Sequence, residues 1–440
     1  MIDNGTSKAT SVLGPNDSCL VRKLEWVEVK MLDDDTILHA ACNTRYDESD
    51  YIRDYDDFLR IVAEANAAKA ARRVPMLDLK AHYHSMKPEM DAAIMEVLES
   101  AYYINGPAVA QFESEFAKYI DTSHCVGVST GTDALFMALE AMNIRAGDEV
   151  IVQGNAYIAD SLAVHYSGAK LVLIDQDDTY GLDLTKLRAA ITPRTRLVIA
   201  VHMYGACCNM DDLVSICQEE KILLVEDCAH SHGATWRGRP LGSFGDMSCF
   251  SFYPGKTLGA YGDAGACCTN SARLDKALRL LRNYGSDRKY YNDTVGKNNR
   301  LDTVQAAVLS VKLKYLPQHN SRRRAIAAAY KKGLGHLPNV TFPTVLEQCV
   351  PVYHQFVMKV ERRDELLAHL LAAGIDSMIH YPIPIHRQKS FEEVCREYVP
   401  ALPLSDSYCD HILSLPMCPM MTDDMVSRVV NAVLAYYIKP

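Results

Sequence analysis

The sequence predicts an α/β protein with a mostly parallel sheet covered by helices on both faces, followed by a smaller C-terminal α+β domain. Between about Ala110 and Asn270, stretches of helical periodicity alternate with turn signals and short apolar runs. The 440 residues also exceed what one hydrophobic core usually holds. We therefore expect an N-terminal extension, a large domain and a small domain, at residues 1–74, 75–320 and 321–440.

Five short apolar runs are the predicted strands of the large sheet. The segments between them are long enough for the crossover helices that parallel strands require. The runs are Glu149–Gln153, Leu171–Ile174, Leu197–His202, Ile222–Glu226 and Met247–Phe252.

The pattern becomes mainly helical after Asp275. We expect helices at Arg300–Leu316 and Arg322–Leu334, with Pro317 as a stop between them. The small domain should contain a strand within Val352–Val360 and a helix at Arg363–Ala373.

Composition excludes several classes of protein. The 46 Lys and Arg against 55 Asp and Glu give a net charge of −9, and no long basic run is present, so nucleic acid is not an expected partner. No signal-peptide pattern or membrane-length apolar stretch occurs, and we expect a cytoplasmic protein with no membrane partner. The 14 cysteines are scattered and are expected to be small buried hydrophobic residues, with no metal site.

Two segments offer groups for an anionic, nitrogen-containing ligand at the carboxyl ends of the strands. Gly131 and Thr132 open a helix whose backbone N–H groups could bind a phosphate, although a helix cap is the commoner explanation of such a pair. Asp227 ends an apolar strand. A buried carboxylate needs a partner such as a protonated pyridine nitrogen, unless it only caps the next turn.

A lysine in the loop Ser251–Ala260 is the third candidate. Lys256 lies among glycines with few charges nearby. A partly desolvated lysine loses proton affinity and attacks carbonyls, as Schiff-base formation requires, whereas most lysines are solvated surface residues. The fourth segment, Gly296–Asp302, is by itself a turn and a helix start.

Together these segments resemble the DegT/DnrJ/EryC1 sugar aminotransferases, which have the fold-type-I architecture of enzymes that use pyridoxal phosphate (PLP). The resemblance extends from about Pro75 to Pro440. The matching segments follow the order of the family and are Gly131–Leu135, Tyr157–Ala159, His202–Gly205, Glu226–Asp227, Ser251–Gly265, Arg282–Gly285, Asn298–Gln305 and Leu413–Pro416.

The resemblance implies a role for each matching residue. Lys256 would carry PLP as a Schiff base and shuttle the proton between substrate and cofactor carbons, and Asp227 would keep the pyridine nitrogen protonated. The other implied cofactor contacts are Gly131, Thr132 and Ser251 at the phosphate, Tyr157 on the ring face, and Asn298 reaching the phosphate of the neighbouring subunit. The resemblance therefore implies a homodimer with shared active sites.

Two positions depart from the usual family pattern. His230 stands where Gln is usual, and either side chain could hydrogen-bond the phenolic oxygen of the cofactor. Thr257 replaces a usual Asn. Relatives that catalyse dehydration at C3 carry histidine at the position of Lys256, so the resemblance implies transamination.

The loop Gly255–Gly265 is similar to enzymes that aminate C3 of a dTDP-linked 3-keto-6-deoxyhexose, with L-glutamate as the implied donor. A UDP-linked 3-keto substrate and amination at C4 are the alternatives within the family. A PLP-fold regulator without turnover is the alternative from another class. It is disfavoured because Lys256, Asp227, Ser251 and Asn298 are all present.

The N-terminal extension carries a second resemblance. Residues 19–59 are similar to the tail of the cupin dTDP-sugar 3,4-ketoisomerases, which supply 3-keto substrates. His39 is the only histidine in this stretch, so it is expected to be a remnant without catalysis of its own.

Overall fold

The computed structural model describes residues 73–396 and 401–438, together with residue 60 and three short strands near the N-terminus. The chain separates into two compact units, Met1–Arg73 and Val74–Pro440. In the first unit, β1 (Ile2–Asp3) pairs antiparallel with β2 (Lys8–Ala9) and with β3 (Trp26–Val27). His39 and most of the ketoisomerase-like stretch lie outside the described residues.

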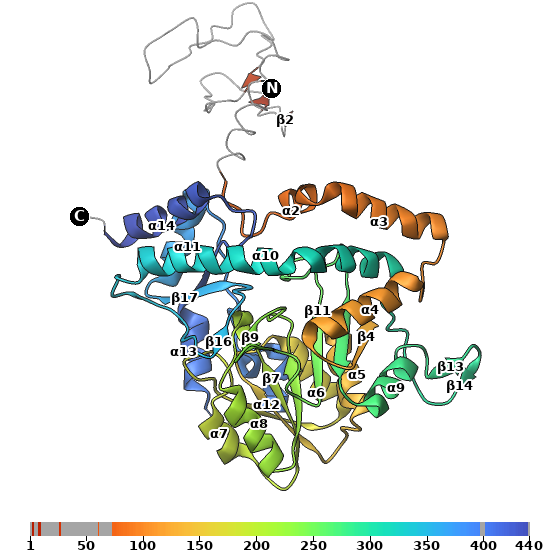
Figure 1. Cartoon of the computed structure of the whole chain (residues 1–440). Coiled ribbons are helices and arrows are strands. Elements are labelled where there is room, and N and C mark those ends of the chain that lie inside the picture. The colour runs from red at the N-terminus through yellow and green to blue at the C-terminus, as the bar shows by residue number, and fades with distance from the viewer. Residues whose placement is uncertain are drawn as a thin grey trace, which may run out of the picture. The chain divides into compact units, whose positions relative to one another are not determined.

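The second unit is built on a seven-stranded sheet with the order β4-β12-β11-β8-β7-β5-β6 (Figure 1). Its neighbouring strands are parallel except that β12 runs antiparallel to β11 and β4. The strands are β4 (His124–Val128), β5 (Glu149–Gln153), β6 (Lys170–Ile174), β7 (Thr195–Val201), β8 (Leu223–Asp227), β11 (Met247–Ser251) and β12 (Gly265–Thr269). The predicted mostly parallel sheet is confirmed.

Helices cover both faces of this sheet, as predicted. Consecutive residues of β5 show why, because Val150 and Val152 enter one buried cluster whereas Ile151 enters another. The first face packs against α5 (Gly131–Ala141), α6 (Ile158–Ser167) and α9 (Ala272–Leu281). The clusters on the other face include α4 (Pro107–Ile120), α7 (Leu184–Ala190), α8 (Met210–Glu219) and α10 (Thr303–Leu334).

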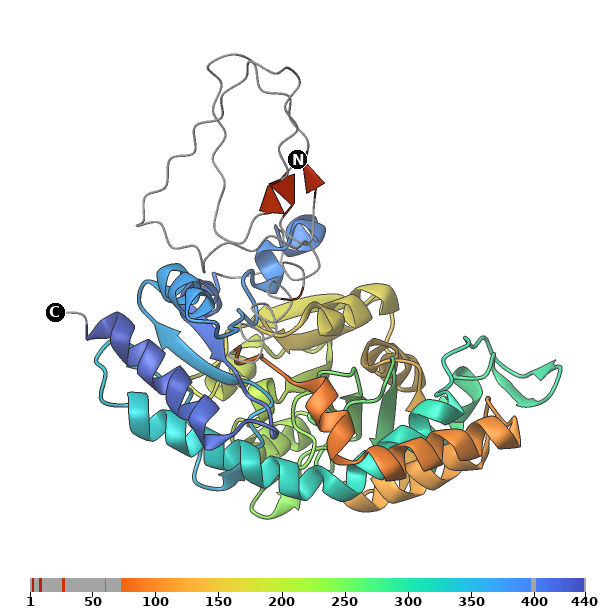
Figure 2. The same cartoon turned by 90° about the horizontal axis from the view of Figure 1, so that it is seen from above.

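The long helix α10 corrects one prediction. Pro317 lies inside it and does not end it. Proline removes one helical hydrogen bond at a cost of about 3 kcal/mol. However, α10 packs on α3 (Lys87–Ser100), α4 and α14 (Asp423–Tyr437), which sustains a single helix across the proline (Figures 1 and 2). The domain division at residue 320 falls inside α10 and stays a prediction.

A smaller antiparallel sheet follows α10, with the order β15-β17-β18. Its strands are β15 (Val340–Thr341), β17 (Phe356–Val360) and β18 (Ile412–Leu415). They pack with α11 (Arg363–Ala372), α14 and the end of α10 around a core of their own. The observed strand β17 covers only the second part of the predicted range Val352–Val360. The observed helix α11 ends one residue before the predicted end at Ala373.

Shorter elements complete the described part of this unit. They are α2 (Leu79–Ser85), β9 (Thr235–Trp236), β10 (Arg239–Pro240), β13 (Ser286–Arg288), β14 (Tyr291–Asn292), β16 (Cys349–Val350), α12 (Glu392–Arg396), α13 (Pro403–His411) and the 3-10 turns η2 (Met203–Gly205), η3 (Ile385–Arg387) and η4 (Lys389–Phe391). All twelve cysteines in the described part are free and buried, as expected. Among these residues, no helix has both the length and the apolar character to cross a membrane.

Candidate active site

The predicted phosphate-binding residues come together where β4 leads into α5 and β11 ends. Gly131 is the first residue of α5, and the Thr130 hydroxyl caps the helix by accepting from Asp133 N–H at 2.9 Å. A Cβ on Gly131 would lie 2.4 Å from Ser251 Cβ, so only glycine fits against Ser251. Thr132 follows in the same first turn. The free N–H groups of this turn, the positive helix end and the adjacent Ser251 hydroxyl suit a phosphate.

The loop that carries Lys256 is held closed by its own backbone. Lys256 N–H donates to the Tyr253 carbonyl at 2.8 Å. A Cβ on Gly259 would lie 2.4 Å from the Pro254 carbonyl oxygen, so the close approach of the two loop arms requires glycine. From α10, Lys312 Nζ donates to the Gly259 carbonyl at 2.6 Å. These contacts fix the position of Lys256.

The side chain of Lys256 is poised for nucleophilic chemistry. Burial lowers the pKa of Lys256 to about 8, although the charges of Asp227 and Asp160 act in the opposite direction. A larger fraction of the amine is then unprotonated near neutral pH, and the unprotonated amine is the form that attacks carbonyls.

Asp227 is the last residue of β8 and is only 6% exposed. Its Oδ1 accepts from Ala229 N–H at 2.8 Å. Burial raises the pKa of Asp227, and this backbone hydrogen bond and Lys256 only partly offset the rise. Asp160, in the first turn of α6, is fully buried beside Asp227. Asp160 was not predicted from the sequence, because an acidic residue in a first helical turn usually only complements the dipole.

His230 is 4% exposed, and its protonation follows from its neighbours. The backbone N–H of Tyr204 donates to His230 Nδ1 at 3.3 Å. Burial lowers the pKa of His230 well below its usual value, and Lys256 adds to the effect, so the ring is neutral. Because Nδ1 accepts, Nε2 carries the hydrogen and is available as a donor. This donor is the group that a phenolate oxygen requires.

Thr257, the second departure from the family pattern, is tied to the core. Its Oγ1 lies 3.0 Å from His232 Nδ1, and both residues are buried. Burial lowers the pKa of His232 to about 3, so its ring is neutral at physiological pH. His232 therefore anchors Thr257, the residue after Lys256.

Tyr157 immediately precedes α6, and 50% of its surface is exposed. Its ring centroid lies 5.2 Å from that of Tyr381, from the C-terminal part of the chain. Burial raises the pKa of Tyr381, and the charges of Asp227 and Asp160 contribute to this rise. This electrostatic link associates the two tyrosines with the Asp227 group.

Asn298 is exposed, as Tyr157 is. Its segment runs beside the end of β4, where Ser129 N–H donates to the Asn299 carbonyl at 3.1 Å. Within the described ranges, no hydrogen bond joins its side chain to any of the other seven predicted residues. An exposed position is compatible with a contact to a second subunit.

Two histidines from segments that flank the smaller sheet also reach the site and were not predicted from the sequence. The rings of His354 and His230 lie 4.5 Å apart. His380 donates or accepts at Ser414 Oγ, 2.8 Å from its Nδ1, and burial and Lys256 lower the pKa of His380 to about 4. Nothing in the sequence around these histidines predicts a contact with a residue more than 100 positions away.

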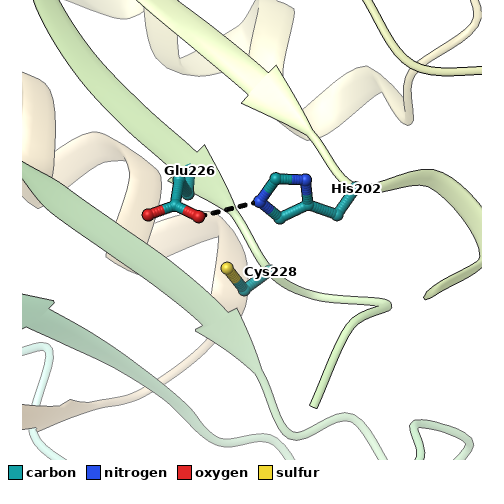
Figure 3. A group of neighbouring side chains, drawn as sticks. All are labelled: His202, Glu226 and Cys228. Carbon is teal, nitrogen blue, oxygen red and sulfur yellow. Dashed lines mark hydrogen bonds and ion pairs between the residues drawn. The ribbon is translucent and has the colours of Figure 1, made fainter. Parts of the chain in front are cut away.

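A second polar cluster lies beside the site and has a different character (Figure 3). His202, Glu226 and Cys228 place one ligand atom each within 4.8 Å of one another, the spacing of a possible metal site. However, Glu226 accepts from His202 Nε2 at 2.9 Å and from the N–H groups of Gly242, Phe244 and Gly245 at 2.7–2.8 Å. Both carboxylate oxygens are therefore occupied, and the cluster fixes the loop after β10.

The described groups fit the chemistry of PLP. The nucleophilic lysine matches the aldehyde of PLP, and the buried carboxylate matches its pyridine nitrogen. The neutral histidine donor matches the phenolate, and the helix end that begins with glycine matches the phosphate. The sheet with its single antiparallel strand and this set of groups define the class of PLP-dependent transferases.

Comparison with known proteins gives the family. Residues 84–434 match the DegT/DnrJ/EryC1/StrS aminotransferase family, and the chain belongs to it. It is therefore a nucleotide-sugar aminotransferase that depends on PLP.

Two curated relatives and one solved structure are similar over most of the chain. The dTDP-3-amino-3,4,6-trideoxy-alpha-D-glucose transaminase of Streptomyces venezuelae is 46% identical over 364 residues, 82% of this chain and 95% of the relative. The dTDP-3-amino-3,6-dideoxy-alpha-D-galactopyranose transaminase of Aneurinibacillus thermoaerophilus is 44% identical over 366 residues, 82% and 99% of the two chains. The crystal structure of S. venezuelae DesV with a ketimine intermediate is 44% identical, has a TM-score of 0.81, and covers 84% of this chain and 99% of DesV.

The N-terminal extension matches a different family. Residues 1–63 match FdtA, described as WxcM-like, C-terminal. The resemblance predicted for the N-terminal extension, to a family other than the aminotransferases, is confirmed.

Proposed function

We propose that the protein transfers an amino group to C3 of a dTDP-linked 3-keto-6-deoxyhexose, with L-glutamate as the donor. One observation carries this proposal. The two transaminases described above, which are 44–46% identical to this chain, are both named after dTDP-3-amino sugars. The Gly255–Gly265 loop, which is similar to that of C3-aminating enzymes, supports the same position. The FdtA match at the N-terminus supports a link to 3-keto sugars.

The roles of the site residues belong to this proposal. When bound, PLP supplies an electron sink for the carbanion that forms at the amino-bearing carbon. Lys256 holds the cofactor covalently through Nζ and, once released, moves a proton at the substrate carbon. Asp227 keeps the pyridine nitrogen protonated, and the His230 Nε2–H donates to the phenolate oxygen.

The remaining residues orient the cofactor. The first turn of α5 at Gly131 and Thr132, together with the Ser251 hydroxyl, binds the phosphate. Tyr157, half exposed beside α6, stacks on the ring face.

The regiochemistry is tested by product NMR. The purified enzyme is given L-glutamate with the dTDP-linked 3-keto sugar, its 4-keto isomer and a UDP-linked 3-keto sugar in parallel. We expect the 3-amino product and 2-oxoglutarate from the first. The 4-keto isomer should turn over far more slowly because its reacting carbon is displaced, and the UDP-linked sugar should turn over more slowly because its nucleotide differs. An amine on C4, or preference for the UDP-linked sugar, would contradict the proposal and leave the PLP chemistry intact.

A homodimer with shared sites is the second part of the proposal. It is supported by the exposed position of Asn298 and by exposed apolar side chains near it, including Tyr291 and Val295. We expect mixed subunits of Lys256→Ala and Asn298→Ala to regain activity, because one site of each heterodimer is then free of both substitutions. Confirmed heterodimers without recovered activity would exclude sharing. The cytoplasmic location also stays a prediction.

A further inference from the structure

Asp160 is a fully buried acid that the proposed function leaves without a role. Its relative exposure is 0%, and neither carboxyl oxygen receives a hydrogen bond from any donor in the described part of the chain. Buried carboxyl groups normally have partners, and a bare buried charge is costly. An orphaned carboxyl in the interior of a site therefore requires an explanation.

The group beside it is another acid, Asp227. As neighbouring buried groups they affect each other in opposite directions, because Asp227 raises the pKa of Asp160 and Asp160 lowers that of Asp227. Two carboxylates cannot donate to each other, so a hydrogen bond between them exists only when one carries a proton. Adjacent buried acids share a single proton because two like charges close together repel strongly.

The surroundings determine which acid holds the proton. Asp227 accepts the Ala229 N–H at 2.8 Å, and it also feels the positive charge of Lys256, so its ionised form is the better stabilised. For Asp160, only its own backbone N–H, which makes no well-formed hydrogen bond to the carboxyl group, and the Lys256 charge favour the ionised form. The positive end of the α6 dipole favours an ionised Asp160, but only weakly compared with burial next to a second anion.

The other titratable groups near the pair do not change this assignment. Tyr381, from the C-terminal part, faces both acids, and its pKa is raised by burial, so it is neutral. His202, the residue after β7, affects Asp227, but its Nε2 is already bonded to Glu226.

We propose that Asp160 is a positioning residue that stays protonated and donates a hydrogen bond to Asp227, which holds Asp227 as the carboxylate oriented toward the pyridine nitrogen. The proposal rests on the role assigned to Asp227. It predicts that the proton, and not a negative charge, is what the site needs at position 160.

Two substitutions separate these possibilities. Asp160→Asn keeps a donor of the same shape but has no charge in any state, whereas Asp160→Leu removes the donor. Asp212→Asn is the control, because it removes a carboxylate from the first turn of another helix, α8, at an exposed position.

The first measurement is infrared spectroscopy of the cofactor-free protein at neutral pH. We expect the carbonyl stretch of a protonated carboxylic acid in the wild type and in Asp212→Asn, and its loss in Asp160→Asn. Because no cofactor is present, this band is independent of the role of Asp227 in catalysis. A wild type without the band would overturn the proposal even if the transaminase activity is as expected.

The second measurement is the dissociation constant of PLP, obtained from its absorption on binding. Asp160→Asn should stay within about threefold of the wild type, while Asp160→Leu should bind about tenfold or more weakly, the effect of losing one hydrogen bond to a charged group. If Asp160 were ionised, Asn would remove an anion beside the pyridine nitrogen and weaken binding as much as Leu. Equal losses in the two variants would therefore overturn the proposal.

Discussion

Glu226 and Asp227 are adjacent acids on β8, both buried, and their environments are opposite. Glu226 accepts from His202 and from three backbone N–H groups, whereas Asp227 accepts a single backbone hydrogen bond. Burial acts to raise the pKa of both acids. For Glu226 the hydrogen bonds from His202 and the backbone outweigh burial and lower the pKa, whereas the pKa of Asp227 stays raised.

The difference follows from strand geometry. Successive residues of a strand point to opposite faces, so Glu226 turns toward the loop after β10 and Asp227 toward the Lys256 loop. A carboxylate whose acceptor sites are all used stabilises structure. One that keeps unused capacity at the carboxyl end of a parallel strand is available to a ligand.

The largest expected effect concerns Lys256, whose loop Asp227 faces. Lys256→Ala should lower transamination by about 10⁴-fold or more, because no other group can hold the cofactor covalently. Lys312 is the matched comparison, since burial also lowers its pKa to about 8, but its Nζ is bonded to the Gly259 carbonyl. After borohydride reduction, mass spectrometry should find the cofactor mass on Lys256 only. Cofactor mass on Lys312 would refute the assignment.

The next effect separates the two adjacent acids. Asp227→Asn should lower kcat/KM by about 10²–10³-fold with little loss of stability, as the removal of a single electrostatic contact at a reacting centre does. Glu226→Gln should instead lower the free energy of unfolding by about 2–4 kcal/mol, because backbone donors of the 242–245 loop lose a charged acceptor.

Urea denaturation of the cofactor-free proteins and kinetics of the loaded ones measure the two quantities separately. The cofactor must be absent in the first because its binding stabilises the folded state. The comparison fails if Glu226→Gln keeps full stability, or if Asp227→Asn unfolds as readily as Glu226→Gln.

The contributions of Glu226 and Asp160 to stability should depend on pH with opposite signs. The folded-state pKa of Glu226 is lowered, so its contribution is present above the unfolded value of about 4.3 and is lost as the pH falls through the folded value. The folded-state pKa of Asp160 is raised, so the folded state holds an extra proton and stability falls as the pH rises above about 3.9.

Denaturation of variants across pH 3 to 8 tests these signs. The deficit of Glu226→Gln relative to the wild type should shrink as the solution is acidified. Asp160→Asn should be more stable than the wild type at neutral pH and approach it in acid. A deficit of Asp160→Asn that grows with pH would show that its carboxylate, and not its protonated form, is the stabilising state.

The main sheet was predictable from sequence where its strands are apolar and β-branched. Glu149–Gln153 was placed to the residue, and the four other predicted strands lie within two residues of their observed bounds. β4 and β12 were not predicted. β12 (Gly265–Thr269) consists of Gly, Ala, Cys and Thr and so has weak β-propensity, and β4 contains Gly127.

The site was predictable only where residues close in sequence share a motif. The Lys256 loop and the start of α5 were found in this way, and the structure brings Gly131 against Ser251. His354 and His380 enter the site through tertiary packing of the smaller sheet, for which local sequence has no signal. Pro317 is the converse case, where packing along α10 overrides a strong local preference.

The smallest expected effect concerns His230, at the candidate active site, which is compared with His202, beside Glu226. His230 accepts at Nδ1 from Tyr204 N–H and has a donor at Nε2, and a glutamine amide can do both through its oxygen and nitrogen. His230→Gln should therefore stay within about threefold of the wild type in kcat/KM, whereas His230→Leu should lose about tenfold or more, because the phenolate loses its donor. His202→Gln on the structural side should lower the unfolding temperature and leave kcat/KM nearly unchanged, since His202 contacts Glu226. If His230→Gln were as slow as His230→Leu, the site would need the imidazole ring itself, and a hydrogen-bond donor would not be a sufficient account of His230.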